Sequence, residues 1–183
     1  VDLKARKVLV TGCGPVGLMS IAVAKAGGAR SVYATDITEY RLNLARTMGA
    51  DLALNARTED VKAAILAATD GEGVDALLEM SGAPSAIDQG FSVLKPGGEA
   101  ALLGLAPAPF TFDWNAHIVA KAAKVYGISG RKLWETWYQA RGLVRSGAVN
   151  LAPLVTHKFR LEEFEQAFAV MMSGESGKVM LIP

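Results

Sequence analysis

The feature that most constrains the fold is a glycine-rich turn, Gly12–Gly17, which reads Gly-Cys-Gly-Pro-Val-Gly and fits the pattern G-x-G-x-x-G. It lies between an apolar run that ends at Thr11 and a helical pattern that begins at Val16. In this context the first glycine allows a tight turn, the second allows a pyrophosphate to approach the backbone, and the third lets the helix pack against the strand. The N–H groups and dipole of the helix N-terminus favour a phosphate there. Three glycines alone would also fit a plain packing turn.

The chain repeats this strand-then-helix order. Apolar runs alternate with helical patterns at residues 8–11, 16–26, 32–35, 40–48, 52–54, 59–68, 74–79, 85–94, 100–104 and 124–128. Strands that alternate with helices imply right-handed crossovers and a mostly parallel sheet that is covered on both faces. We therefore predict an α/β fold with a doubly wound parallel sheet, a Rossmann dinucleotide-binding domain.

The pattern changes towards the C-terminus. A longer helix is expected after Gly130 and runs to about Arg145, with an apolar stripe interpreted mostly as core at Leu133, Trp137, Ala140 and Val144. From about residue 150 we expect a strand at 154–159, a helix at 162–172 and a last strand at 179–182. We therefore divide the chain into a dinucleotide-binding domain, residues 1–149, and a C-terminal segment, residues 150–183, that belongs to another structural unit.

Asp36 supplies the second part of the dinucleotide pattern, because it ends the second strand 19 positions after Gly17. An acidic side chain there can accept hydrogen bonds from the ribose hydroxyls of adenosine. The alternative is that Asp36 only begins the turn at residues 36–38. The carboxylate would repel a 2′-phosphate by about 4 kcal/mol per charge at about 4 Å, so NAD is favoured over NADP. Arg41 would soften that repulsion or stack on adenine, or it is a solvated helix residue.

Gly104, Ser81–Gly82 and Ile128–Ser129 follow the ends of later strands. Open α/β sheets bind ligands beyond the carboxyl ends of their strands. These positions are therefore candidates for ligand contact, although glycines there serve equally well as turn formers.

Composition excludes several classes. In 183 residues, 19 Lys and Arg face 18 Asp and Glu, a net charge of +1, which argues against nucleic-acid and membrane-surface partners. No apolar stretch approaches the roughly 18 residues of a membrane-spanning helix and no leader is recognisable, so we expect a cytoplasmic protein. Cys13 is the one cysteine, and we expect it to be an apolar filler. His117 and His157 have no ligand-type neighbours at metal-binding spacing, so core or surface roles are favoured.

Several stretches together resemble the medium-chain zinc-dependent alcohol dehydrogenases. The shared motifs are residues 10–17 with Asp36, then residues 46–51 and 94–98. More specific stretches are similar to members that act on L-threonine, and these are residues 36–42, 130–137 and 154–159. The resemblance covers essentially the whole chain.

The resemblance implies NAD contacts at Gly12, Gly14, Pro15, Val16, Gly17, Asp36, Arg41, Leu103, Gly104, Leu105, Ile128 and Ser129. In the complete enzyme it implies oxidation of the secondary hydroxyl of L-threonine to 2-amino-3-oxobutanoate, with hydride transfer to NAD. The family's zinc is held by Cys, His and Glu residues of an N-terminal domain that we expect this chain to lack. No catalytic or metal-binding residue is therefore assigned here, and the chain alone is expected to be inactive.

Other functions stay open. A polyol dehydrogenase of the sorbitol or butanediol type is the nearest alternative, followed by a non-enzymatic NAD-binding or oligomerising module. An S-adenosylmethionine methyltransferase is disfavoured because the strand Lys7–Thr11 carries no carboxylate. The resemblance also implies that the edge strand at residues 124–128 pairs with a second copy across a twofold axis, giving a homo-oligomer. Alternatively, the segment after Asn150 covers that edge.

Overall fold

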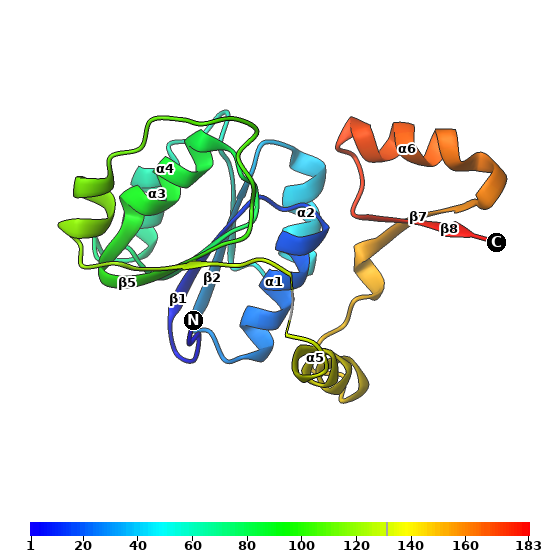
Figure 1. The fold of residues 1–183 in the computed structure, drawn as a ribbon, viewed down its shortest axis with the longest axis horizontal. Coiled ribbons are helices and arrows are strands. Elements are labelled where there is room, and N and C mark those ends of the chain that lie inside the picture. The colour runs from blue at the N-terminus through cyan, green and yellow to red at the C-terminus, as the bar shows by residue number, and fades with distance from the viewer. Residues whose placement is uncertain (131) are drawn as a thin grey trace.

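A six-stranded parallel sheet carries the fold, in the order β3-β2-β1-β4-β5-β6 (Figure 1). The computed structural model describes residues 1–130 and 132–183, so the Arg131 position of the motif at 130–137 lies outside the described residues. The strands are β1 (Lys7–Thr11), β2 (Ser31–Asp36), β3 (Leu52–Asn55), β4 (Val74–Glu79), β5 (Leu94–Leu102) and β6 (Lys124–Gly127). The strand order reverses between β1 and β4, which is where such sheets bind ligands.

Helices cover both faces of the sheet, because alternate strand residues point to opposite sides. On one face α1 (Pro15–Ala26) and α2 (Glu39–Thr47) pack with Val8 and Val10 of β1. On the other face α3 (Val61–Ala68) and α4 (Pro84–Val93) pack with Leu9 of the same strand. The predicted doubly wound α/β fold is therefore confirmed.

The connection from β5 to β6 spans residues 103–123. It contains a π-helical turn, η1 (Asn115–Val119), and is fastened to α4 by side chains. His117 Nε2 lies 2.9 Å from Asp88 Oδ1, and Lys121 Nζ donates to the carbonyl of Phe91 at 2.6 Å. His117 is thus a packing residue of this connection.

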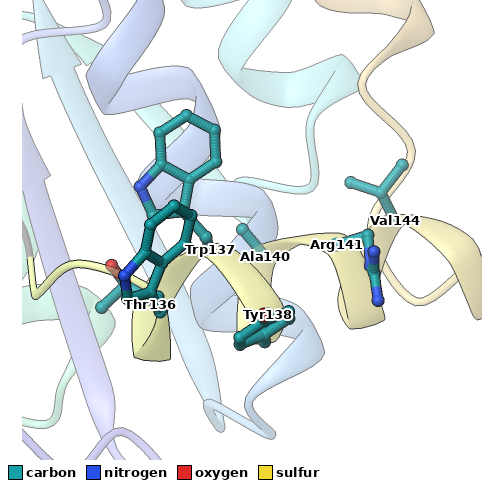
Figure 2. A pocket seen from close by; sticks show the side chains of 7 residues that line it. Thr136, Trp137, Tyr138, Ala140, Arg141 and Val144 are labelled. Atoms are coloured by element: carbon teal, nitrogen blue, oxygen red, sulfur yellow. The ribbon is translucent and has the colours of Figure 1, made fainter.

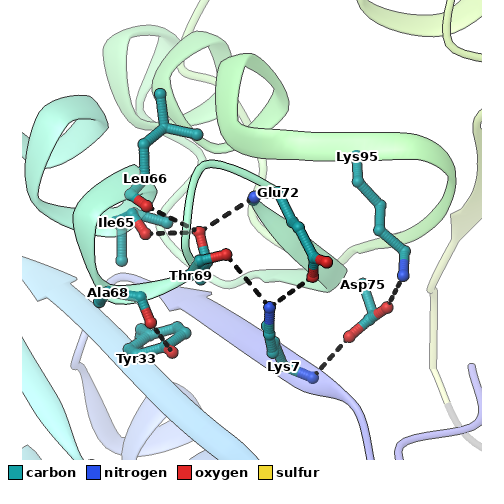
Figure 3. Close-up of polar contacts among 10 residues, drawn as sticks. Lys7, Tyr33, Ile65, Leu66, Ala68, Thr69, Glu72, Asp75 and Lys95 are labelled. Carbon is teal, nitrogen blue, oxygen red and sulfur yellow. Dashed lines mark hydrogen bonds and ion pairs between the residues drawn. The ribbon is translucent and has the colours of Figure 1, made fainter.

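A polar network joins the amino ends of the strands, at the opposite edge from the glycine turn (Figure 3). Lys7 Nζ donates to Glu72 Oε2 at 2.7 Å and to the Thr69 carbonyl at 3.3 Å. The Lys7 amide donates to Asp75 Oδ2 at 2.7 Å, and Asp75 also forms an ion pair with Lys95. The network ties β1 to the loop before β4.

The C-terminal elements form a second, smaller sheet. The elements are α5 (Glu135–Arg145), η2 (Ala152–Leu154), β7 (Val155–Arg160), η3 (Leu161–Glu163), α6 (Phe164–Ser173) and β8 (Lys178–Ile182). Strands β7 and β8 pair with each other in parallel, and α6 packs on both. Figure 1 shows this unit beyond α2, on the side of the sheet away from α3 and α4. The domain boundary near residue 150 stays a prediction.

Two apolar surfaces, on α5 and on β6, are uncovered. The apolar stripe expected over residues 133–144 is not core, because Leu133, just before α5, is 66% exposed and Val144 of α5 is 47% exposed. Its helical spacing showed which side is apolar but not whether another element covers it. All residues of β6 are exposed at the sheet edge, while η2 packs against α1 and α2, so the C-terminal segment does not bury this edge.

None of the helices in the described part of the chain is long and apolar enough to cross a bilayer. The cytoplasmic location stays a prediction.

Candidate functional site

The glycines of the turn have three different environments. Gly12 has φ +85°, and a Cβ there would lie 2.8 Å from Ser81 Cβ. A Cβ on Gly17 would lie 1.8 Å from the carbonyl oxygen of Gly12, so the first turn of α1 packs directly on the turn. A Cβ on Gly14 would meet no heavy atom within 4 Å. Gly12 and Gly17 are therefore required by the fold, whereas Gly14 borders open space that a ligand can enter.

That open space is a cavity of about 470 Å³ beside the carboxyl ends of β1, β2 and β4. Its lining combines the glycine turn with the ends of three strands and with α4. The lining residues are Gly12, Gly14, Thr35, Asp36, Ile37, Arg41, Ala56, Arg57, Met80, Ser81, Ala83, Ser85, Ala86 and Gln89. Five predicted residues thus meet in one cavity, and they are Gly12, Gly14, Asp36, Arg41 and Ser81.

Asp36 both lines the cavity and organises its wall. Its Oδ2 accepts a hydrogen bond from the Cys13 amide at 2.7 Å, while Oδ1 accepts from the amides of Ile37 at 2.8 Å and Thr38 at 3.0 Å. The side chain is buried. The turn interpretation and the ligand interpretation of Asp36 therefore do not exclude each other, because the carboxylate builds the turn and the residue also lines the cavity.

The charges of Asp36 and Arg41 act at the same point of the turn. Burial raises the pKa of the Cys13 thiol well above its usual range, the nearby Asp36 charge raises that pKa further, and the Arg41 charge lowers it. A thiol in this state is neutral and unreactive, which agrees with a filler role for Cys13. Arg57, after β3, also lines this cavity.

Glu79, at the end of β4, is a residue that supports the candidate site and that the sequence reasoning missed. It is fully buried, and its Oε1 accepts hydrogen bonds from Thr11 Oγ1 at 3.3 Å, from the Ser81 amide at 2.8 Å and from the Ser81 hydroxyl. The Gly82 amide also donates to it, at 3.0 Å. Glu79 therefore fixes the loop that forms one wall of the cavity. An acidic residue at the end of an apolar run was the available signal.

The other predicted contacts lie outside this cavity lining. Pro15, Val16 and Gly17 begin α1 beside it, while Leu103–Leu105 and Ile128–Ser129 follow β5 and β6. All are at the carboxyl edge of the sheet. Their roles stay predictions. Within residues 1–130 and 132–183, no three His, Cys, Asp or Glu side chains are grouped to hold a metal ion.

A larger hollow, of about 850 Å³, follows the exposed side of α5 (Figure 2). It is lined by Trp134, Thr136, Trp137, Tyr138, Ala140, Arg141 and Val144. All of these residues belong to one helix and the segment just before it, and the Arg141 guanidinium lies 5.5 Å from the centre of the Tyr138 ring. A binding site normally gathers polar groups from several elements. This hollow is therefore an uncovered helix face, and the cavity at the glycine turn is the candidate site.

A doubly wound parallel sheet, with a glycine-rich turn and an acidic strand end at one cavity, defines a dinucleotide-binding domain. The family model described as zinc-binding dehydrogenase matches residues 15–146, and the chain belongs to this family.

Similar proteins agree with this assignment. The chain is 47% identical over 182 residues to an L-threonine 3-dehydrogenase of Thermococcus kodakarensis, covering 99% of this chain and 52% of that protein. It is 49% identical over 174 residues to the L-threonine 3-dehydrogenase of Bacillus subtilis, covering 95% and 50%. The chain thus spans about half the length of these curated relatives.

Solved structures also match over about half of their own length. An alcohol dehydrogenase from Thermotoga maritima has a TM-score of 0.89 at 32% identity, covering 100% of this chain and 51% of that one. A 2R,3R-butanediol dehydrogenase from Bacillus subtilis has a TM-score of 0.88 at 29% identity, covering 98% and 51%.

Proposed function

We propose that this chain binds NAD, with the pyrophosphate at Gly14 and the adenosine ribose at Asp36. The observation that carries the proposal is that an open glycine position and a buried carboxylate line the same cavity. The first turn of α1 begins directly after Gly14 and presents free N–H groups to the phosphates. Leu103–Leu105 and Ile128–Ser129, at the same edge of the sheet, are proposed to contact the nicotinamide half.

Calorimetry with NAD and NADP tests the adenosine assignment. The unmodified chain should prefer NAD, and Asp36→Ala should narrow that preference because it removes the charge that repels a 2′-phosphate. Equal affinities of the unmodified chain for both coenzymes would show that the role given to Asp36 is wrong.

Gly14→Val tests the pyrophosphate assignment. Gly14 has φ −66° and ψ −179°, which valine adopts without strain, and its Cβ would meet no protein atom. The variant should therefore melt like the unmodified chain and lose NAD binding, because the side chain occupies the space of the coenzyme. A folded variant that keeps its affinity contradicts the assignment.

For the complete protein we propose oxidation of the secondary hydroxyl of L-threonine to 2-amino-3-oxobutanoate, with hydride transfer to NAD. Support comes from the relatives of that name at 47% and 49% identity. The described residues of this chain bind and orient the coenzyme. A zinc ion held by residues from elsewhere in the complete enzyme would polarise the substrate hydroxyl.

Steady-state rates of the complete protein with L-threonine, 2,3-butanediol and sorbitol test the substrate. Threonine should give the highest kcat/KM, and a preference for butanediol would favour the polyol alternative, which the butanediol dehydrogenase match keeps relevant. The chain alone, with zinc added, should produce no NADH from threonine. Zinc-dependent NADH formation by it would contradict this division of roles.

We also propose that two copies associate through β6. The Ile128 amide donates to the Leu102 carbonyl at 2.9 Å, so amides at alternate positions face β5 and the Val125 amide faces the free edge. Sedimentation should show a dimer that Val125→Pro dissociates, whereas Val125→Thr keeps the amide and the dimer. A monomer at high micromolar concentration would contradict the proposal.

A further inference from the structure

Glu79 is a buried acidic residue that is held by hydrogen bonds alone. Its side chain is fully buried, and it takes part in no ion pair within the part of the chain that the structure describes. Its oxygens accept from Thr11 Oγ1 and from Ser81 and Gly82 in the loop after β4. Burial of a carboxyl group without a paired cation is costly. These hydrogen bonds therefore offset a cost that an apolar residue at the same place would not have.

The main chain of Glu79 holds a second loop, the one that follows β5. Glu79 pairs with Leu102, the last residue of β5, so residues 103–105 leave the sheet directly beside it. Its carbonyl oxygen accepts from the Leu103 amide at 3.0 Å and from the Gly104 amide at 3.2 Å. One residue thus fastens two loops, the loop after β4 by its side chain and the loop after β5 by its main chain.

These two loops are packed against each other without a gap. A Cβ on Gly104 would lie 2.1 Å from the Gly82 amide nitrogen and 2.5 Å from Glu79 Oε2. A Cβ on Gly82 would lie 2.3 Å from the carbonyl oxygen of Leu105. Backbones this close leave no room for one loop to move without the other. The position of residues 103–105 therefore depends on where Glu79 holds Gly82.

We propose that Glu79 is a positioning residue for the nicotinamide half of the coenzyme. Its carboxylate holds the loop after β4, and that loop holds residues 103–105 in the conformation that receives the ligand. The proposal deepens the proposed NAD function and rests on it. Glu79 is not one of the described residues that line the cavity, so it acts through the loops and not by touching the coenzyme. A segment that is already ordered binds without the entropy cost of ordering it, so the gain falls on the nicotinamide half alone.

The test compares NAD with ADP-ribose, which has the same adenosine and pyrophosphate but lacks nicotinamide. By calorimetry the unmodified chain should bind NAD about tenfold more tightly, the size expected for about one added hydrogen bond. Glu79→Ala should reduce this preference to about twofold. Glu79→Gln should keep most of it, because its amide oxygen still accepts from Ser81 and Gly82. Partial unfolding lowers the apparent affinity for both ligands by the same factor, so the ratio isolates the positioning effect.

Glu99→Ala is the matched control. Glu99 on β5 is also a buried acidic residue, but it lies beside Lys124, the first residue of β6, away from both loops, and it pairs with Arg6 and Lys124. Its removal should lower the unfolding free energy and leave the ratio of the two affinities unchanged.

Glu79→Ala leaves buried donors without a partner and can lose its fold. Glu79→Asp then serves, because it keeps the carboxyl group but is one methylene shorter and draws back from the Ser81 loop. Hydrogen exchange over residues 103–105 should be faster in this variant, and its preference for NAD should fall. If the unmodified chain binds neither NAD nor ADP-ribose, the proposed function fails. If it binds both equally, or if the folded Glu79 variants weaken both by the same factor, the positioning role is overturned while coenzyme binding stands.

Discussion

The sheet body, residues 1–128, and the C-terminal part, residues 132–183, show similar amphipathic patterns but opposite burial. In the body, nearly all the large apolar side chains of β1 and β4 are enclosed between two helical layers. In the C-terminal part, buried apolar residues are few, and they are Val149, Leu154 and Ala167. Large side chains of α5, α6 and β8 are exposed instead. Large apolar side chains therefore form the core in one region and lie on the surface in the other.

The difference also separates the cavity from the rest of the chain. All residues that line the cavity at the glycine turn belong to the sheet body. The C-terminal part contributes one two-stranded sheet with α6 packed on it. Coenzyme binding should therefore depend on the body, whereas the C-terminal elements carry surface suited to further contacts.

Matched phenylalanine substitutions should give the largest contrast. Phe91 on α4 is 1% exposed and packs edge-on against Phe112 at 5.2 Å, so Phe91→Ala should cost about 3–5 kcal/mol of unfolding free energy. Phe168 on α6 is 54% exposed, so Phe168→Ala should cost about 1 kcal/mol. Urea titrations measure both. Equal costs would show that α6 is buried in solution and would break the comparison.

Replacing each of two helix glycines by alanine should change the unfolding free energy in opposite directions. A Cβ on Gly17 would lie 1.8 Å from a backbone oxygen, so Gly17→Ala should destabilise the body by at least about 1–3 kcal/mol. A Cβ on Gly142 in α5 would meet no heavy atom within 4 Å, so Gly142→Ala should stabilise its helix by about 0.5–1 kcal/mol. Thermal melts followed by circular dichroism measure the signs. A loss of stability for Gly142→Ala would mean that α5 packs closely on something.

The sheet body was largely predictable from the sequence, because each of its elements has a local signal. The turn Gly12–Gly17 and Asp36 indicated which edge of the sheet faces a ligand. The apolar runs that alternate with helical patterns indicated a doubly wound parallel sheet. Local signals failed where a role depends on distant neighbours. In the sequence Glu79 is only an acidic residue in an apolar run, and its role depends on hydrogen bonds from Thr11 of β1 and from the Ser81 loop. Arg57 lines the cavity only because β3 lies beside β2.

The C-terminal part shows a second limit of prediction from the sequence. Helical spacing correctly predicted α5, but the burial of its stripe was wrong, because an amphipathic pattern specifies a face and not its partner. The strands expected at 154–159 and 179–182 are β7 and β8, and they pair with each other in parallel. Pairing depends on the crossover through α6, which no local pattern encodes.

The smallest expected effect is a loss of unfolding free energy in acid, which should arise in the sheet body from the Lys7 network (Figure 3). The hydrogen bond and charge of Lys7 lower the pKa of Glu72 below its ordinary value of 4.5. Burial alone would raise the pKa of Asp75, but the Lys95 side chain and the Lys7 amide outweigh it and hold that pKa below 3.8. Carboxyls with a lowered pKa in the folded state contribute stability above their unfolded pKa, and this stability is lost as pH falls.

The unfolding free energy of the chain should therefore decline as pH drops below about 5 and continue to fall through the lowered pKa values, because the unfolded state takes up protons first. Glu72→Gln should flatten this decline slightly, since the side chain is exposed and its ion pair is screened by solvent. Asp75→Asn should flatten it more, because its oxygens bind both Lys95 and the β1 backbone. Glu162→Gln removes the same charge from the C-terminal part without touching this network, and chemical denaturation at pH 7, 5 and 3 compares the three. If Glu162→Gln flattens the curve as much as Asp75→Asn does, acid stability is not a property of the sheet body and this part of the comparison fails.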